Sequence, residues 1–176
     1  MTHQGSGGSA PYDAREVANY VLDEAERIGI SLTQLQLYKI VYFAHGWYLA
    51  TEGRHLIKQN FQAWEYGPVV LVLRDAFKSA GKMSILCRAE RMDLHTGELI
   101  KIQPMSNESD CRFVSKIVHF YSSFDGWALS EITHEPGSPW SAVWNTDKPT
   151  GNLGLRISNE MIKEYFERLP RKFVMN

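Results

Sequence analysis

The chain has 176 residues, 44% of them hydrophobic and 12% aromatic, and its 19 basic and 20 acidic side chains give a net charge of −1. This length fits one domain with one core, and the apolar share is large enough to offset the entropy lost when the chain folds. The balanced charge excludes a global field that would hold the protein on nucleic acid or on an anionic membrane.

The sequence predicts one domain with short segments at either end. Residues 1–10 are rich in Gly and Ser and have neither the basic start nor the apolar core of a secretion signal, so we expect a flexible lead. The domain is expected over residues 11–170 and a tail over residues 171–176. The longest apolar run, residues 40–50, is interrupted by a His and a Gly and is shorter than the roughly 20 residues that a bilayer requires. We therefore expect no membrane span.

The two cysteines, Cys87 and Cys111, indicate a reducing compartment. They form no C-x-x-C pair and are too few for a disulfide framework. We expect the protein in the cytoplasm.

Helical patterns dominate the first part of the domain. Asp13 and Glu16 have the spacing of a capping box, and apolar residues then recur at helical spacing over residues 13–28. A second capping pattern opens a helix over residues 33–53, which is apolar nearly all round. Such a helix is expected in the middle of a bundle.

The next stretch contains the predicted sheet element. Residues 61–66 are aromatic and partly alternating, and Gly67-Pro68 breaks this pattern and predicts the start of a helix over residues 69–80. Residues 85–102 are β-prone around a His-Thr-Gly loop, which predicts a hairpin. We expect this hairpin to be the only sizeable sheet element.

The last part is again helical. Apolar spacing predicts a helix over residues 107–124, and Asp125 and Ser138 are typical caps for two short helices that follow. A loop is expected over residues 145–154 and a final helix over residues 158–169. The fold class predicted is mainly α, a single-domain helical bundle around a central apolar helix with a small β-hairpin insertion.

The sequence contains no motif of a familiar catalytic or metal site. It has no G-x-S-x-G elbow, no phosphate loop and no G-x-G-x-x-G. The histidines of the predicted domain are dispersed and none has metal-ligand spacing; they are His45, His55, His95, His119 and His134. We expect no cofactor and no metal, and we interpret His45 and His119 as packed, hydrogen-bonded core residues.

A cysteine and four glutamates are further candidates for catalytic residues. Cys111 has no activating neighbour and is expected to be packed. Four glutamates have the chemistry of an acid and base pair if folding brings two of them together; they are Glu52, Glu65, Glu131 and Glu135. A hydrolase with dispersed His and Glu residues is therefore an alternative, although we do not expect an enzyme.

A small basic cluster lies near the C-terminus. Arg168, Arg171 and Lys172 accompany Phe166 and Phe173, and basic and aromatic residues together can hold nucleic acid. Three basic residues also suit the C-terminal end of a helix, where cations are favourable. We interpret the cluster as such a helix end and do not expect nucleic-acid binding.

Three segments together resemble one family. Residues 32–50 have a Leu-Thr start, a Lys, a tyrosine-rich turn and a Gly-Trp-Tyr step; residues 61–70 contain Ala-Trp-x-x-Gly-Pro-Val; residues 129–140 contain Leu-x-x-x-Thr-His followed by Pro-Trp. In this order they resemble the Panacea domain family, which includes SocA-like and GepA-like proteins. His45 departs from the family pattern, which more often has Gln there.

The resemblance implies a mostly helical antitoxin that neutralises a cognate protein toxin by direct binding. An alternative is an adaptor that delivers the toxin to an ATP-dependent protease, with residues 1–10 or 173–175 as a docking peptide. Trp47 and Pro68 are interpreted as core and turn residues. The expected partner-binding residues are aromatic and polar groups of the second and third segments, namely Trp64, Tyr66, Thr133, His134, Pro139 and Trp140.

Overall fold

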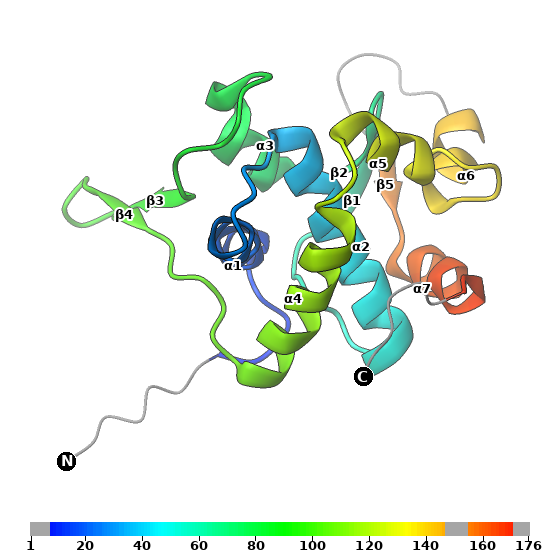
Figure 1. Ribbon diagram of the computed structural model, residues 1–176, viewed down its shortest axis with the longest axis horizontal. Coiled ribbons are helices and arrows are strands. Elements are labelled where there is room, and N and C mark those ends of the chain that lie inside the picture. The colour runs from blue at the N-terminus through cyan, green and yellow to red at the C-terminus, as the bar shows by residue number, and fades with distance from the viewer. Residues whose placement is uncertain (1–7, 147–154, 171–176) are drawn as a thin grey trace.

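The computed structural model describes residues 8–146 and 155–170, and the fold is mainly α, as predicted (Figure 1). The helices are α1 (Ala14–Arg27), α2 (Gln34–Glu52), α3 (Leu71–Phe77), α4 (Glu108–Tyr121), α5 (Gly126–Thr133), α6 (Pro139–Thr146) and α7 (Asn159–Arg168). Most of the predicted lead, most of the predicted loop over residues 145–154 and the predicted tail lie outside the described residues.

Helix α2 is covered on every side. Its residues are buried without interruption from Leu37 to Leu49, and α1, α3, α4, α5 and α7 all contact it. In Figure 1 it lies between α1 and α7. The predicted capping box forms at its start, where Thr33 and Gln36 bond each other's backbone N–H. No helix in the described part of the chain is long and apolar enough to cross a membrane.

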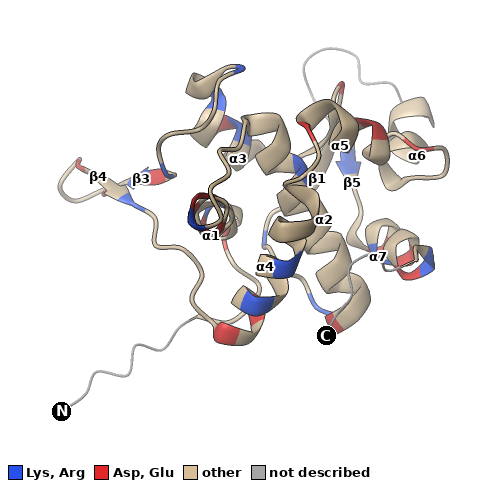
Figure 2. Ribbon diagram, in the orientation of Figure 1, with Lys and Arg blue, Asp and Glu red and all other residues tan. Residues whose placement is uncertain are grey.

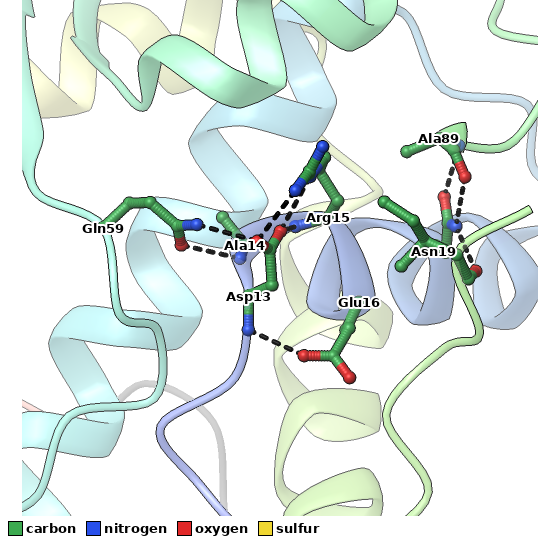
Figure 3. A network of polar contacts seen from close by, with 8 residues as sticks. Asp13, Ala14, Arg15, Glu16, Asn19, Gln59 and Ala89 are labelled. Carbon is green, nitrogen blue, oxygen red and sulfur yellow. Dashed lines mark hydrogen bonds and ion pairs between the residues drawn. The ribbon is translucent and has the colours of Figure 1, made fainter. Parts of the chain in front are cut away.

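The start of α1 is fixed by polar contacts that the sequence predicts only in part. Asp13 and Glu16 form the expected capping box, with the backbone N–H of Asp13 donating to Glu16 at 2.7 Å (Figure 3). The side chain of Gln59 adds two bonds: it accepts from the backbone N–H of Ala14 at 2.9 Å and donates to Asp13 at 2.9 Å. The segment after α2 is thereby attached to the beginning of α1.

Side-chain caps are also present in the second half, including the two predicted at Asp125 and Ser138. The side chains of Asn107, Asp125 and Ser158 accept hydrogen bonds from the first backbone N–H groups of α4, α5 and α7. The hydroxyl of Ser138 accepts from the backbone N–H of Ser141 at 3.1 Å at the start of α6. Side-chain oxygens at these positions satisfy N–H groups that a helix leaves unpaired.

The expectation that the hairpin is the only sizeable sheet element is wrong. A three-stranded antiparallel sheet has the order β2-β1-β5, from strands β1 (Phe61–Trp64), β2 (Gly67–Val69) and β5 (Leu155–Ile157). Its strands are three or four residues long, and β5 lies about ninety positions after β1 in the chain. In the sequence, neither an alternating pattern nor a local turn marks the pairing of β1 with β5.

The role predicted for Gly67-Pro68 is also wrong. Pro68 lies in β2 opposite Ala63, and α3 begins only at Leu71. Strand β2 is at the edge of the sheet, where a proline is tolerated because one side of the strand needs no partner. After α3 the chain continues as a short 3₁₀ turn, Lys78–Ala80, which ends at the predicted Gly81.

The predicted hairpin is confirmed. Strands β3 (Glu90–Met92) and β4 (Leu99–Lys101) pair antiparallel and project from the body of the protein (Figure 1). A buried side chain of α1 fastens their base: Asn19 accepts from the backbone N–H of Ala89 at 2.7 Å and donates to the carbonyl of Ile102 at 2.7 Å. The hairpin is therefore connected to the core at its base, while both strands are exposed.

Packing between α2 and α7 allows a stability test at Gly46. A Cβ at this position would lie 2.4–2.6 Å from three atoms of the Phe166 ring. We expect Gly46→Ala to lower the free energy of unfolding by about 1–3 kcal/mol, the usual cost of overpacking a core, measured by urea denaturation. In a Phe166→Leu background the same substitution should cost less, since the ring is gone. Equal costs in the two backgrounds would contradict this packing.

Candidate functional site

The three segments that carry the family resemblance meet in space. The amine of Lys39, in α2, donates to the carbonyl of Pro68, in β2, at 3.1 Å. A Cβ placed on Gly67 would lie 2.5 Å from the hydroxyl of Thr133, at the end of α5, and 2.8 Å from the Lys39 amine. Gly67 also has φ of +108°, which side chains disfavour. We call Lys39, Gly67, Pro68 and Thr133 the motif cluster.

Lys39 is an unusual residue for the middle of a protein. It is fully buried, and among the described residues no carboxylate forms an ion pair with it. Burial penalises the charged amine and lowers the pKa of Lys39 to about 7. A substantial share of this amine is therefore neutral at physiological pH.

His134 packs beside the motif cluster. Its ring stacks on that of Trp140, with centroids 3.7 Å apart and an angle of 17° between the planes. Burial, and next the nearby charge of Lys39, lower the pKa of His134. Its Nε2 atom is buried and has no hydrogen-bond partner among the described residues. The imidazole is therefore a neutral stacking partner for Trp140.

Hydrogen bonds fix the turn between α5 and α6. The hydroxyl of Thr133 donates to the carbonyl of Ser130 at 2.7 Å, and the hydroxyl of Ser138 donates to the carbonyl of Thr133 at 2.8 Å. The indole N–H of Trp140 donates to the carbonyl of Trp64 at 2.7 Å. The third motif segment is thereby bonded to the second.

Above this buried set lies an exposed pair of aromatic rings, Tyr66 and Trp127. The Tyr66 side chain is 48% exposed and that of Trp127 63% exposed. Their rings meet edge to face, with centroids 5.4 Å apart at 88°. The hydroxyl of Ser130 donates to the carbonyl of Tyr66 at 2.5 Å, so α5 fixes the backbone of Tyr66 as well as its ring. We call Tyr66 and Trp127 the aromatic pair.

All six predicted partner-binding residues lie in this region, but they differ in exposure. Only Tyr66 is exposed; Trp64 and His134 are half-buried, and Thr133, Pro139 and Trp140 are buried. The buried residues Thr133, Pro139 and Trp140 contribute to a surface by positioning its exposed residues. A binding role for all six residues stays a prediction.

Sequence reasoning missed Trp127 and did not single out Lys39 or Gly67. Trp127 lies two residues after Asp125, the cap of α5. The sequence does not reveal that its side chain is exposed. Lys39 was visible as a charge within an apolar helix. Its contact with Pro68 was not.

The two core assignments for histidines have different outcomes. His45 is packed as predicted: its ring nitrogen lies 2.8 Å from the Asn159 side-chain oxygen, and burial lowers its pKa to about 4. The assignment of His119 to the core is wrong. His119 is on the exposed side of α4, 2.9 Å from a carboxylate oxygen of Glu24 in α1. Phe113, Ile117 and Tyr121 occupy the buried side of α4, and the helical period places position 119 on the opposite side.

The other candidate groups do not form a site. Glu52, Glu65, Glu131 and Glu135 are all exposed. Within the described ranges, no three His, Cys, Asp or Glu residues are grouped as metal ligands would be. Cys111 is half-buried, and burial raises the pKa of its thiol. Of the C-terminal basic cluster, Arg168 ends α7, whereas Arg171 and Lys172 lie outside the described residues.

The motif cluster predicts a difference between two glycines with positive φ. Gly67→Ala introduces both backbone strain and a collision with Thr133 and Lys39, whereas Gly97, with φ of +74°, has no atom near its added Cβ. We expect Gly97→Ala to lower the free energy of unfolding by about 1 kcal/mol and Gly67→Ala by about 1–3 kcal/mol more. Urea denaturation of both variants measures this. Equal losses would show that the cluster is not closely packed.

The buried amine predicts a pH dependence of stability. Because the pKa of Lys39 falls from 10.5 to about 7 on folding, the unfolded chain binds more protons between these values, so this residue makes stability rise with pH there. Relative to Lys39→Met, the wild-type free energy of unfolding should increase between pH 7 and pH 9, by at most about 1.4 kcal/mol per pH unit. Parallel curves from urea titrations of the two proteins would contradict the burial of a titrating amine.

Comparisons with known proteins agree with the resemblance drawn from the three segments. A family profile described as "Antitoxin SocA-like, Panacea domain" matches residues 37–141, which include the motif cluster and the aromatic pair. The chain is 34% identical over 154 residues to a protein of Caulobacter vibrioides (strain NA1000 / CB15N) named "Antitoxin SocA", covering 88% of this chain and 82% of that protein. No solved structure matches the chain. The chain therefore belongs to the family of SocA-like antitoxins that contain a Panacea domain.

Proposed function

We propose that this protein neutralises a cognate protein toxin by binding it directly. The observation that carries the proposal is the likeness to a protein named as an antitoxin over 88% of this chain. The match extends well beyond the three motif segments and includes most of the helices. A shared fold and a shared role are therefore expected over nearly the whole domain.

The geometry of the motif cluster supports a binding role. Its groups are buried: Lys39 bonds Pro68 in β2, Ser138 bonds the carbonyl of Thr133, and Trp140 bonds Trp64, so these contacts fix the positions of β2, α5 and α6. Preorganised surfaces bind with a smaller entropic cost than flexible ones. An aromatic pair held in this way, Tyr66 and Trp127, suits recognition of another protein.

Two alternatives are less well supported. A hydrolase would need its acid and base to converge, and the four glutamates considered are exposed on different elements or loops. An adaptor role was attributed to residues 1–10 and 173–175, most of which lie outside the described residues. No contact in the described part of the chain favours either role.

Co-expression tests the proposal. The product of the gene next to this chain's gene is expressed from an inducible promoter, with and without this protein. We expect growth arrest by the product alone and normal growth with both. The two purified proteins, mixed without any protease, should elute together in size-exclusion chromatography.

The purified mixture separates direct neutralisation from delivery to a protease. Rescue of growth without complex formation by the purified proteins would contradict direct binding, particularly if the neighbouring product becomes short-lived in cells. Absence of toxicity from the neighbouring product would remove it as the cognate toxin. In that case the other genes of the same operon are the next candidates.

A further inference from the structure

The aromatic pair is one of the exposed apolar features of the described surface. Tyr66 and Trp127 are held edge to face, and the carbonyl of Tyr66 is bonded to Ser130. Their exposed faces are electron-rich, and Trp offers the strongest attraction for a cation among the aromatic side chains. Trp, Tyr and Arg are also the residues that contribute most to protein interfaces. The pair therefore suits a partner that presents cations.

Acidic side chains lie close to the aromatic pair in the sequence. Glu65 directly precedes Tyr66, Asp125 caps α5, and Glu131 lies one helical turn after Trp127 on the same side of α5. All three are exposed, and Figure 2 shows acidic segments on and beside α5. We call Glu65, Asp125 and Glu131 the acidic rim.

No basic side chain in the same segments neutralises the acidic rim. Residues 61–67 and 125–138 contain no Lys or Arg. His134, within the second range, has a lowered pKa and is neutral. Other described cations lie near these segments: Lys39 in α2 donates to the carbonyl of Pro68 at 3.1 Å, Arg74 in α3 lies over the ring of Trp64 at 4.7 Å and bonds Asp75 at 3.3 Å, and Arg156 in β5 stands opposite Gln62. Residues 61–67 and 125–138 themselves therefore carry a net negative charge although the whole chain is nearly neutral.

We propose that the aromatic pair and its acidic rim bind an arginine-bearing segment of the partner protein, which under the proposed function is the toxin. Guanidinium groups stack on Tyr66 and Trp127, and they form charge-assisted hydrogen bonds with the rim carboxylates. Arginine fits better than lysine, because its planar group stacks on a ring and bonds a carboxylate at the same time. This inference rests on the proposed function for the identity of the partner.

The family pattern is consistent with this location. Glu65 and Tyr66 occupy the two open positions of Ala-Trp-x-x-Gly-Pro-Val, and Glu131 occupies an open position of Leu-x-x-x-Thr-His. The fixed positions beside them, such as Gly67 and Thr133, form the motif cluster.

The hairpin is the main competing surface. It exposes Met92, Leu94 and Leu99, so it also has apolar area available for a partner. Its charges, however, have both signs, because Glu90 faces Lys101 across the strands. It therefore lacks the one-sided charge that indicates a partner of definite chemistry.

Binding of the neighbouring gene product, measured by isothermal titration calorimetry, tests the proposal. Trp127→Ala and Glu131→Lys should each weaken binding at least tenfold, and Trp127→Phe should weaken it less. Glu131→Lys should also reduce the dependence of affinity on salt. Matched controls are Leu94→Ala, on the hairpin, and Glu164→Lys, on the exposed side of α7; both should bind like the wild type. Circular dichroism establishes that each variant is folded.

Three outcomes of this experiment would overturn the inference. Unchanged affinity of Trp127→Ala and Glu131→Lys would show that the partner binds elsewhere. A large loss on Leu94→Ala with none on Trp127→Ala would assign binding to the hairpin. Conversion of a wild-type dimer to a monomer by Trp127→Ala, seen by sedimentation, would show that a second copy of the chain covers the pair.

A peptide probe keeps the inference testable if the neighbouring product does not bind the wild type. That result would contradict the proposed function and not the chemistry of the surface. The probe is a short synthetic peptide of alternating arginine and leucine, and its control carries glutamate in place of arginine. Only the arginine peptide should bind at low salt, and Trp127→Ala should remove binding. Equal binding of both peptides, or binding that Trp127→Ala leaves unchanged, would overturn the inference.

Discussion

The complete burial of α2 is the constraint on which the rest of the fold depends. Because its residues are buried from Leu37 to Leu49, no side of the helix is free to face water, and other elements must cover all of it. Five helices and strand β2 do so. Large aromatic rings fill most of the space between them, and at Gly46 the absence of a side chain lets the ring of Phe166 reach the backbone. The arrangement of the outer elements follows from the shape of this one helix.

Burial on all sides also constrains Lys39 and His45 in the middle of α2. An amine or an imidazole taken out of water needs a hydrogen-bond partner or must lose its charge, and both happen here. Lys39 donates to Pro68, and His45 is bonded to Asn159 at the start of α7. Each polar residue thus fixes one neighbouring element against α2. The same burial lowers the pKa values of both side chains.

Interior and surface are divided between residues of the same segments. The motif cluster joins α2, β2 and the end of α5, and its own atoms are buried. What reaches the surface is the aromatic pair, together with the acidic rim. Within these segments, buried residues and exposed residues therefore stand side by side.

The sequence by itself determined the features that depend on near neighbours: the helices, their caps at Asp13, Thr33 and Asp125, the hairpin, and the apolar character of α2. It also identified the family, through motifs that each lie within one segment. Only the tertiary structure decided the three-stranded sheet, the exposed side of α4 that holds His119, and the meeting of Lys39, Gly67 and Thr133. These features join residues that are far apart in the chain, and local periodicity carries no information about such contacts. The exposure of Trp127 was likewise decided by packing, because a tryptophan in a short helix has the same local pattern whether it is covered or not.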